Sequence, residues 1–391
     1  MKTLVFLIKE ESVKKTKDIL WGGATASSQY EGGYKEGGKG LDTQDCRPYL
    51  KRTSDATTST RLLTQDIIDE AKKCEGIGHY PFRQGSDGYH HIDEDIALLK
   101  EMGFKMFRLS ISWSRIYPTG EETEPNQAGL DFYRNVFTEL RNAGIEPLVS
   151  IWHFDTPLAL EEKYGDWQDR KYIELYEKYV TTIFKEYKGL VKYWLTFNEI
   201  NNTINFLPDN ASDEAFQEAY QHLHYQFVAS ARAVQIGHAI DPDYQIGCMI
   251  CGITYYPLTS DPEDILFNRY KWEKGIFYCG DVQCKGKYPT YAKRLWKEHN
   301  VELDITEQDL VELKNGTVDL YTFSYYMSQS ITTHKNEDTV GGNMSFGVRN
   351  PYLTYSDWGW ALDPEGLRYY LEVVYDRYDP PNIRTAFKCC S

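Results

Sequence analysis

The 391-residue sequence predicts an α/β fold, a (β/α)8 barrel in which about six of the eight βα units are present. Two observations favour this class. Short apolar runs of strand character alternate with longer segments of helical period, which is the pattern of βα units around a parallel sheet. The hydrophobic content of 41% also suffices for the large core of one barrel domain.

The expected elements follow one another from about residue 19 to residue 378. A loop-rich insertion at 27–87 separates the first strand from the first helix, and another insertion separates the fifth strand from the sixth. Strands are expected at 19–26, 106–111, 147–152, 193–197, 246–253 and 318–323. Helices are expected at 89–102, 129–143, 171–187, 213–240, 290–299 and 364–378.

The barrel domain is expected to span residues 18–378, with an N-terminal extension at 1–17 and a separate tail at 379–391. The tail holds Pro380 and Pro381 followed by a mixed polar run, which makes a poor central strand. A seventh and an eighth strand are therefore not found in the sequence. We expect the barrel to be incomplete.

Composition excludes several classes of partner. A net charge of −15 argues against a nucleic acid or an anionic membrane. No run of about 18 apolar residues is present, and the apolar run at 4–8 is too short for a signal peptide, so a cytoplasmic location is expected. Aromatic residues make up 15% of the chain, and platforms that stack on sugar faces would explain part of this surplus.

The eight cysteines are scattered without framework spacing, which is typical of reduced thiols. Cys248 and Cys251 form a C-x-x-C within an expected strand. Residues three apart on a strand face opposite sides, so a metal or redox pair is not expected there. His222 and His224 lie two apart on a helix and cannot share a face as metal ligands would.

Polar side chains arrive at the carboxyl ends of the expected strands. The apolar run at 194–197, for example, ends abruptly in Asn198 and Glu199. An asparagine and a glutamate at such a place can cap the next helix or serve catalysis, and the other strand ends favour catalysis because barrel active sites are assembled from them. These candidate residues are Gln29, Arg108, His153, Asn198, Glu199, Tyr325 and Tyr326, of which Arg108 lies within its strand and the others follow theirs.

Other polar residues have ordinary structural interpretations. Glu31 is expected to be buried and paired, and His90 and His91 to cap or solvate the start of a helix. Tyr325 and Tyr326 are neighbours on a strand, so only one of them can face the site.

Five stretches carry a family resemblance: WGGATASSQYEG at 21–32, FRLSISWSRI at 107–116, TFNE at 196–199, FSYYMS at 323–328 and SDWGW at 356–360. The sequence resembles glycoside hydrolase family 1 over about residues 18–378. The last two stretches look more like its 6-phospho-β-glucosidase branch.

The resemblance implies a retaining glycosidase in which Glu199 is the general acid/base and no metal or organic cofactor takes part. Such an enzyme uses two carboxyl groups, one to protonate the leaving oxygen and one to attack the anomeric carbon. The resemblance assigns Asn198 to the sugar 2-hydroxyl, Gln29 and His153 to the 3- and 4-hydroxyls, Arg108 and Tyr326 to support of the nucleophilic carboxylate, and Trp358 to the pocket wall.

The sequence departs from the family at the nucleophile. The family's attacking residue is the Glu of a Glu-Asn-Gly tripeptide, and this tripeptide is absent from the chain. Glu365 and Glu372 lie on the last expected helix, outside the barrel, and cannot replace it. We therefore expect a chain truncated before the nucleophile strand and impaired in catalysis, with Arg108 left uncompensated and the first and sixth strands left as open edges.

The function expected from these observations is hydrolysis of small phosphorylated β-glucosides. Two alternatives stay open: a catalytically inactive sugar-binding or misfolded fragment, and a β-glucosidase or β-galactosidase for non-phosphorylated substrates. The sequence does not distinguish a monomer from a homo-oligomer.

Overall fold

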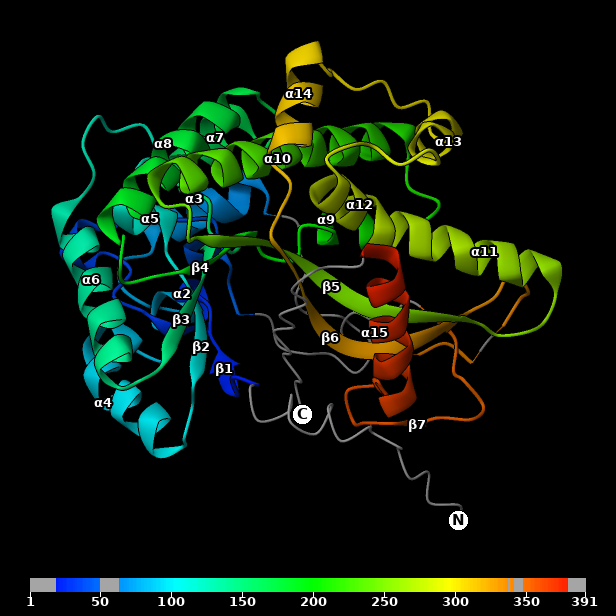
Figure 1. Ribbon diagram of the computed structural model, residues 1–391, viewed down its shortest axis with the longest axis horizontal. Helices are drawn as coiled ribbons and strands as arrows, with labels where there is room; N and C mark the ends of the chain where they lie inside the picture. Colours follow the sequence, from blue (N-terminus) through cyan, green and yellow to red (C-terminus); the bar gives the residue numbers. More distant parts are fainter. Residues whose placement is uncertain (1–18, 50–62, 337, 341–346, 379–391) are drawn as a thin grey trace.

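A single six-stranded parallel sheet organises the computed structural model, which describes residues 19–49, 63–336, 338–340 and 347–378 (Figure 1). The strands are hydrogen-bonded in chain order, each parallel to the next, as consecutive βα units predict. They are β1 (Gly22–Ala24), β2 (Met106–Ser110), β3 (Glu146–Trp152), β4 (Tyr193–Phe197), β5 (Gln245–Pro257) and β6 (Leu320–Ile331).

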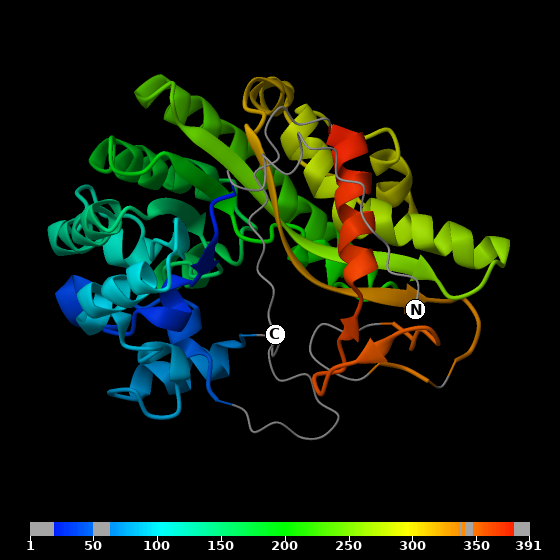
Figure 2. The ribbon, with the colours of Figure 1, turned by 60° about the horizontal axis from the view of Figure 1, so that its bottom comes forward.

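Helices cover the outer face of this sheet (Figures 1 and 2). The longer ones are α3 (Gln65–Lys73), α4 (Gly88–Glu101), α6 (Gln127–Asn142), α8 (Lys171–Glu186), α10 (Asp213–Ile240), α11 (Pro262–Trp272), α12 (Tyr278–Lys285), α14 (Glu307–Asn315) and α15 (Pro364–Tyr378). The shorter elements are α2 (Ser27–Tyr30), α5 (Trp113–Ile116), α7 (Leu158–Tyr164), α9 (Asn202–Asn205), α13 (Ala292–Glu298), the 3₁₀ turns η1 (Glu36–Gly38), η2 (Gln44–Cys46) and η3 (Pro81–Arg83), the π-helical turn η4 (Glu273–Phe277), and the hairpin strands β7 (Thr354–Tyr355) and β8 (Ala361–Leu362).

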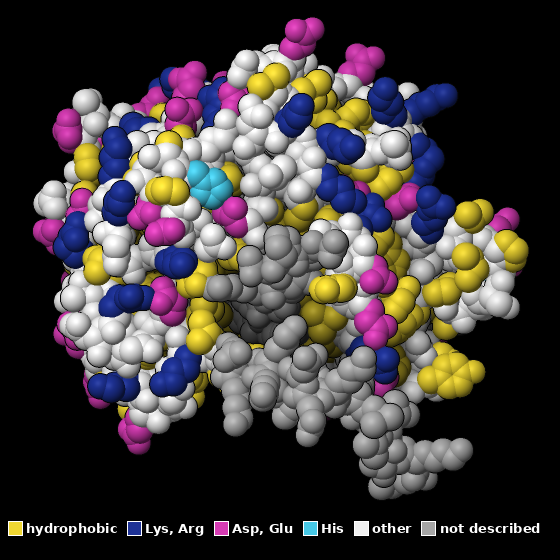
Figure 3. Space-filling view, in the orientation of Figure 1, with side chains coloured by type: hydrophobic (Ala, Val, Ile, Leu, Met, Phe, Trp, Pro, Cys, Tyr) yellow, Lys and Arg dark blue, Asp and Glu magenta, His cyan; other side chains and the backbone are white. Residues whose placement is uncertain are grey.

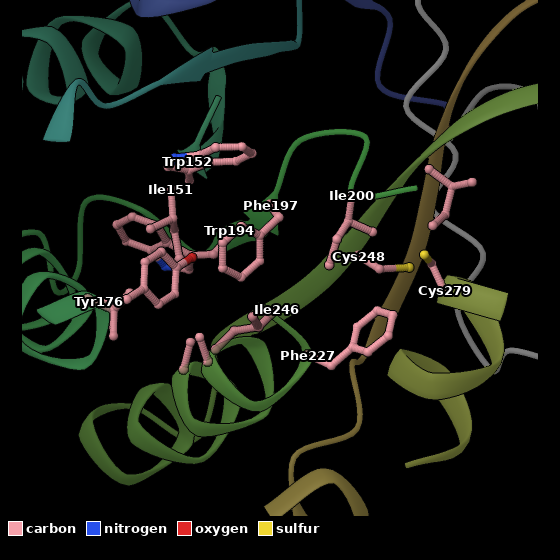
Figure 4. Packing of buried hydrophobic residues seen from close by; sticks show 14 of the residues in the cluster. Ile151, Trp152, Tyr176, Trp194, Phe197, Ile200, Phe227, Ile246, Cys248 and Cys279 are labelled. Atoms are coloured by element: carbon pink, nitrogen blue, oxygen red, sulfur yellow. The ribbon is translucent and has the colours of Figure 1, made fainter. Parts of the chain in front are cut away.

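The main hydrophobic core lies between the sheet and its helices. Trp194 of β4, Ile246 of β5 and Phe227 of α10 are among its buried members (Figure 4). Because the strands are covered on both faces, every residue of β4 is buried, which explains its continuous apolar run. Removing this much apolar surface from water is the main driving force for the fold.

The inner face of the sheet carries a second, smaller core. Leu148, Tyr193, Leu195, Met249 and Leu320 form a cluster across β3, β4, β5 and β6, and each is at most 7% exposed. Above this apolar layer, the strand ends present polar side chains, which is where the candidate site lies.

The sheet is open at both ends within the described residues. β1 pairs with β2 alone and β6 with β5 alone, so these two strands form the edges of a curved, unclosed sheet (Figure 2). This arrangement agrees with the expected six βα units of a (β/α)8 fold. The extension at 1–17 and the tail at 379–391 lie outside the described residues.

The last two strands are longer than expected. We expected them to end at 253 and 323, whereas β5 and β6 remain paired as far as Pro257 and Ile331. The extra length forms a two-stranded arm flanked by α11 and α15 (Figure 1). Apolar side chains of α11 are exposed near its first turn, including Leu266 at 66% (Figure 3).

Several helices in the insertions were not expected from the sequence. α12 is buried at six of its eight positions, and a helix buried all round has no amphipathic period to detect. α3 lies in the segment at 27–87 that was expected to be loop-rich, although it buries only Ile68 and Ala71. No helix of the described chain is long and apolar enough to cross a membrane.

Candidate active site

The carboxyl ends of the strands surround a pocket of about 140 Å³. Its position is the one at which barrel enzymes assemble their catalytic groups. The structure brings together six of the seven site residues expected from the sequence, and several others join them. The lining residues are Ser28, Gln29, Gln44, Phe82, Arg108, His153, Phe154, Asn198, Glu199, Ser324 and Tyr326.

Glu199 lies immediately beyond β4 in a strained backbone conformation. Its φ is +43°, in the left-handed region that residues other than glycine rarely adopt. Glu199 is only 6% exposed, and its carboxylate accepts hydrogen bonds from the Tyr326 hydroxyl at 2.6 Å and the Asn202 side-chain amide at 2.9 Å. Strain of this kind persists where surrounding contacts hold it and is frequent at functional sites.

Tyr326, which donates to Glu199, lies on β6 where the pairing of β5 with β6 is irregular. Gly252 pairs with Tyr325 and Ile253 with Met327, so β6 holds one residue more than β5 at this point. Tyr326 lines the pocket, whereas Tyr325 packs against Tyr370 on the outer side, as the alternation of a strand predicts.

Arg108 brings a buried positive charge to the pocket. Its guanidinium donates to the Ser150 hydroxyl from Nε at 3.0 Å and from Nη2 at 2.8 Å, and Nη2 also donates to the Asn198 side-chain oxygen. Burial lowers the pKa of Arg108 to about 10, although the charge of Glu199 opposes that change. Within the described chain Arg108 forms no ion pair with a carboxylate.

The supporting role expected for Tyr326 takes a different form in the structure. We expected Arg108 and Tyr326 to hold a second, nucleophilic carboxylate. In the described residues Tyr326 donates to Glu199 itself, and Glu199 is the one carboxylate among the residues lining the pocket. A role toward a second carboxylate stays a prediction for both side chains.

Gln29 and His153 reach the pocket from the ends of β1 and β3, the two strands that flank β2. Gln29 lies in α2, which follows β1 directly, and His153 follows β3. His153 is succeeded by Phe154, another residue with a left-handed φ, of +63°. The two side chains therefore line one pocket from strand ends on either side of β2, where each can hydrogen-bond a ligand.

Trp358 lies outside this pocket. It is 52% exposed, between the short strands β7 and β8. Trp360, two residues later, instead packs edge-on against Tyr326 with 5.8 Å between ring centroids. Contact of Trp358 with substrate remains a prediction.

Gln44 and Phe82 line the pocket but were not expected there. Both come from the insertion at 27–87, in η2 and η3. The Gln44 amide donates to the Phe154 carbonyl at 2.6 Å, which fixes the insertion against the end of β3. No periodicity signals such a contact, because it depends on how the insertion folds back over the strand ends.

Glu31, His90 and His91, for which we expected structural roles, make structural contacts. Buried Glu31 accepts from Arg115 at 3.1 Å and from the Tyr133 hydroxyl at 2.5 Å, away from the pocket. His90 and His91 bond Asp87 at the start of α4. The described residues contain no group of three or more His, Cys, Asp or Glu side chains that could hold a metal ion.

This arrangement suits acid chemistry on a polyhydroxylated ligand. Glu199 supplies a carboxyl group, and Asn198, Gln29 and His153 supply hydrogen-bonding groups beside it. Arg108 adds a buried guanidinium, whose Nη2 donates to the Asn198 side-chain oxygen.

Comparison with known proteins identifies the family of this chain. The sequence profile of glycosyl hydrolase family 1 matches residues 12–386. The chain belongs to glycosyl hydrolase family 1. A 6-phospho-beta-glucosidase from Clostridium longisporum is 47% identical over 372 residues, which cover 93% of this chain and 75% of the relative. An aryl-phospho-beta-D-glucosidase from Bacillus subtilis is 47% identical over 373 residues, with the same coverage.

Solved family 1 structures share the fold. The family 1 β-glucosidase from Thermotoga maritima superposes with a TM-score of 0.74 and 27% identity, covering 93% of this chain and 76% of that one. The same enzyme in complex with glucoimidazole gives a TM-score of 0.74 and 26% identity. The expected barrel class and the resemblance to family 1 are thus confirmed.

Proposed function

We propose that this family 1 chain acts on 6-phosphorylated β-glucosides, with Glu199 as the general acid/base. The observation that carries this proposal is the convergence of Glu199, Asn198 and Arg108 in one pocket at the strand ends. The phosphorylated substrate class is supported by the names of the relatives, which are 42–47% identical phospho-β-glucosidases.

Each ligand group has an expected partner in the pocket. Asn198, whose oxygen is held by Arg108, presents its amide to the sugar 2-hydroxyl. Gln29 and His153 bind the 3- and 4-hydroxyls, and Glu199 gives its proton to the leaving oxygen. A bond to the 2-hydroxyl that strengthens in the transition state is worth several kcal/mol in glycosidases.

The second carboxylate of a retaining mechanism would stand beside Arg108. It must lie about 5 to 5.5 Å from the acid/base carboxyl. Since the described pocket lining contains one carboxylate and an arginine without an ionic partner, we propose that the 391-residue chain by itself is impaired in forming the glycosyl-enzyme intermediate.

The test is hydrolysis of p-nitrophenyl 6-phospho-β-glucoside by the 391-residue chain with and without sodium azide. Azide is a small anion that can sit beside Arg108 and attack the anomeric carbon. Its nitrogen would bond to that carbon, the glycosidic C–O bond would break, and the product would be the α-glycosyl azide. We expect slow release of p-nitrophenol alone and faster release with azide.

Calorimetric titration with glucose 6-phosphate and with glucose supplies the second measurement. Tighter binding of the phosphorylated sugar supports the proposed substrate class, and equal binding favours a non-phosphorylated substrate. Rapid azide-independent hydrolysis would show that the chain is not impaired. A folded chain that neither binds the sugars nor cleaves the substrate would refute the proposed function.

A further inference from the structure

A buried carboxylate that the proposed chemistry does not use lies beneath the pocket. Asp155 is 0% exposed and follows His153 by two residues. Its Oδ2 accepts the Ser27 hydroxyl at 2.6 Å, and its Oδ1 accepts the backbone N–H of His153 at 3.1 Å. One side chain therefore bonds two segments that come from different strands.

Both bonded segments carry pocket residues. Ser27 is the first residue of α2, the single turn that also holds Gln29. His153 is itself a pocket residue, and its backbone N–H donates the hydrogen bond to Asp155. Asp155 is thus two residues away from one expected sugar ligand and bonded to the turn that carries the other.

A chain of hydroxyl groups extends this connection to β2. The Ser110 hydroxyl donates to Ser27 Oγ at 2.9 Å, and the Ser27 backbone N–H donates to Ser110 Oγ at 2.7 Å. Ser27, Ser110 and Asp155 are all buried. The ends of β1, β2 and β3 are therefore tied together below the two sugar ligands.

The turn between His153 and Asp155 is held from its other side as well. Phe154 adopts a left-handed φ of +63°, and its carbonyl accepts the Thr43 hydroxyl at 3.0 Å and the Gln44 amide at 2.6 Å. A left-handed phenylalanine is costly, so the turn needs such contacts to persist. Asp155 closes this turn while His153 faces the pocket.

We propose that Asp155 is a positioning residue that sets the spacing of Gln29 and His153, so that both can bond neighbouring hydroxyls of one sugar ring. The inference rests on the proposed function, because it takes these two side chains as sugar ligands. A carboxylate suits the task because it offers acceptor oxygens in two directions, whereas an amide offers one acceptor and one donor group.

The buried environment of Asp155 imposes a free-energy cost on its carboxylate form. Burial raises the pKa of Asp155 to about 7, and the nearby Asp42 carboxylate adds to the rise, while the bonds from Ser27 and His153 oppose it. A buried carboxyl carries a desolvation penalty that an apolar packing residue would avoid. This penalty is consistent with a role in the site.

The experiment measures how strongly the protein distinguishes glucose 6-phosphate from its 3-deoxy and 4-deoxy counterparts by calorimetric titration. The variants are Asp155→Asn, which keeps the shape, and Ser27→Ala, which removes the bonded hydroxyl. Asp309→Asn is the matched control, because Asp309 is equally buried but caps α14 away from the pocket. Thermal unfolding shows that each variant is folded.

We expect Asp155→Asn and Ser27→Ala to reduce the preference for the intact sugar by about fivefold, roughly the weight of one neutral hydrogen bond. Asp309→Asn should keep the wild-type preference. An equal loss of affinity for all three sugars, or an unchanged preference in both variants, would overturn the inference. A wild-type protein without any preference would instead refute the proposed roles of Gln29 and His153.

Discussion

Two residues of the pocket adopt a backbone conformation or an environment that their residue types usually avoid. Glu199 has a left-handed backbone, and Arg108 is buried without a carboxylate partner in the described chain. In each case neighbouring groups compensate: Tyr326 and Asn202 bond the carboxylate, and Ser150 and Asn198 bond the guanidinium. Such conflicts between local preference and structure are expected at functional sites.

Replacement Glu199→Gln tests the proton donor. General acid catalysis contributes about 10²- to 10⁴-fold, so the azide-dependent rate on an alkyl 6-phospho-β-glucoside should fall by about that factor. The rate on the 2,4-dinitrophenyl substrate should change little, because its leaving group departs as a stable anion. Initial rates on both substrates check this. Equal losses on the two would contradict the role of Glu199 as an acid.

At the scale of elements, α15 is attached to the barrel through a buried carboxylate on α12. Asp281 accepts from Arg377 Nε at 2.8 Å and from the Tyr291 hydroxyl at 2.9 Å, and Lys285 lies 3.0 Å away. Burial would raise the pKa of Asp281, but Arg377 and Lys285 outweigh it and lower the pKa below its ordinary value of 3.8. The carboxylate form therefore stabilises the contact between the two helices.

Replacement Asp281→Asn should lower the free energy of unfolding by about 3 kcal/mol at pH 7, because it leaves Arg377 without its partner. A carboxyl with a lowered folded-state pKa stabilises the protein above its unfolded pKa and loses that contribution as the pH falls. The difference in free energy of unfolding between wild type and variant should thus become smaller below about pH 4. Urea unfolding at several pH values measures it.

The matched control is Glu186→Gln, which alters the exposed ion pair of Arg134 with Glu186 on the surface. Exposed pairs contribute about 0 to 1 kcal/mol, so this variant should stay close to wild type. If Asp281→Asn lowers the free energy of unfolding no more than Glu186→Gln does, the attachment of α15 does not depend on the buried ion pair.

On the scale of the whole molecule, one core joins the two halves of the open sheet. The residues between the sheet and its helices form a continuous buried cluster that includes members of β2, β3 and β4 on one side and of β5, β6 and α15 on the other. Figure 4 shows members of this cluster from β3, β4 and β5. A continuous core predicts that the halves unfold together even though the described sheet is not closed.

Replacement Phe227→Ala tests this cooperativity. Phe227 is 1% exposed on α10, and truncation of a buried phenylalanine costs about 3 to 5 kcal/mol. We expect one transition, shifted to lower temperature, with the same midpoint by near-ultraviolet and far-ultraviolet circular dichroism. Leu98→Ala, at a side chain 50% exposed, is the control and should shift little. Two separate transitions in the wild type would show that the halves are independent, and a gradual one would favour the misfolded fragment.

Much of the fold is readable from the sequence because its signals are local. The strand at 193–197 and the helices at 213–240 and 364–378 have the same bounds in the structure as in the expectation. Apolar runs and amphipathic periods record burial residue by residue, so they remain visible without a structure. α12, buried nearly all round, lacks that period and was missed.

The sequence by itself determined the barrel class, the family and the set of polar residues at the strand ends, because each depends on short motifs and on residue order. The tertiary structure alone decided the contacts among them: the hydrogen bond from Tyr326 to Glu199, the place of Gln44 and Phe82 in the pocket, and the bonds from Asp155 beneath Gln29 and His153. Apart from the bond between Asp155 and the His153 backbone, these contacts join residues far apart in the sequence, and their distances are fixed by packing rather than by any local pattern.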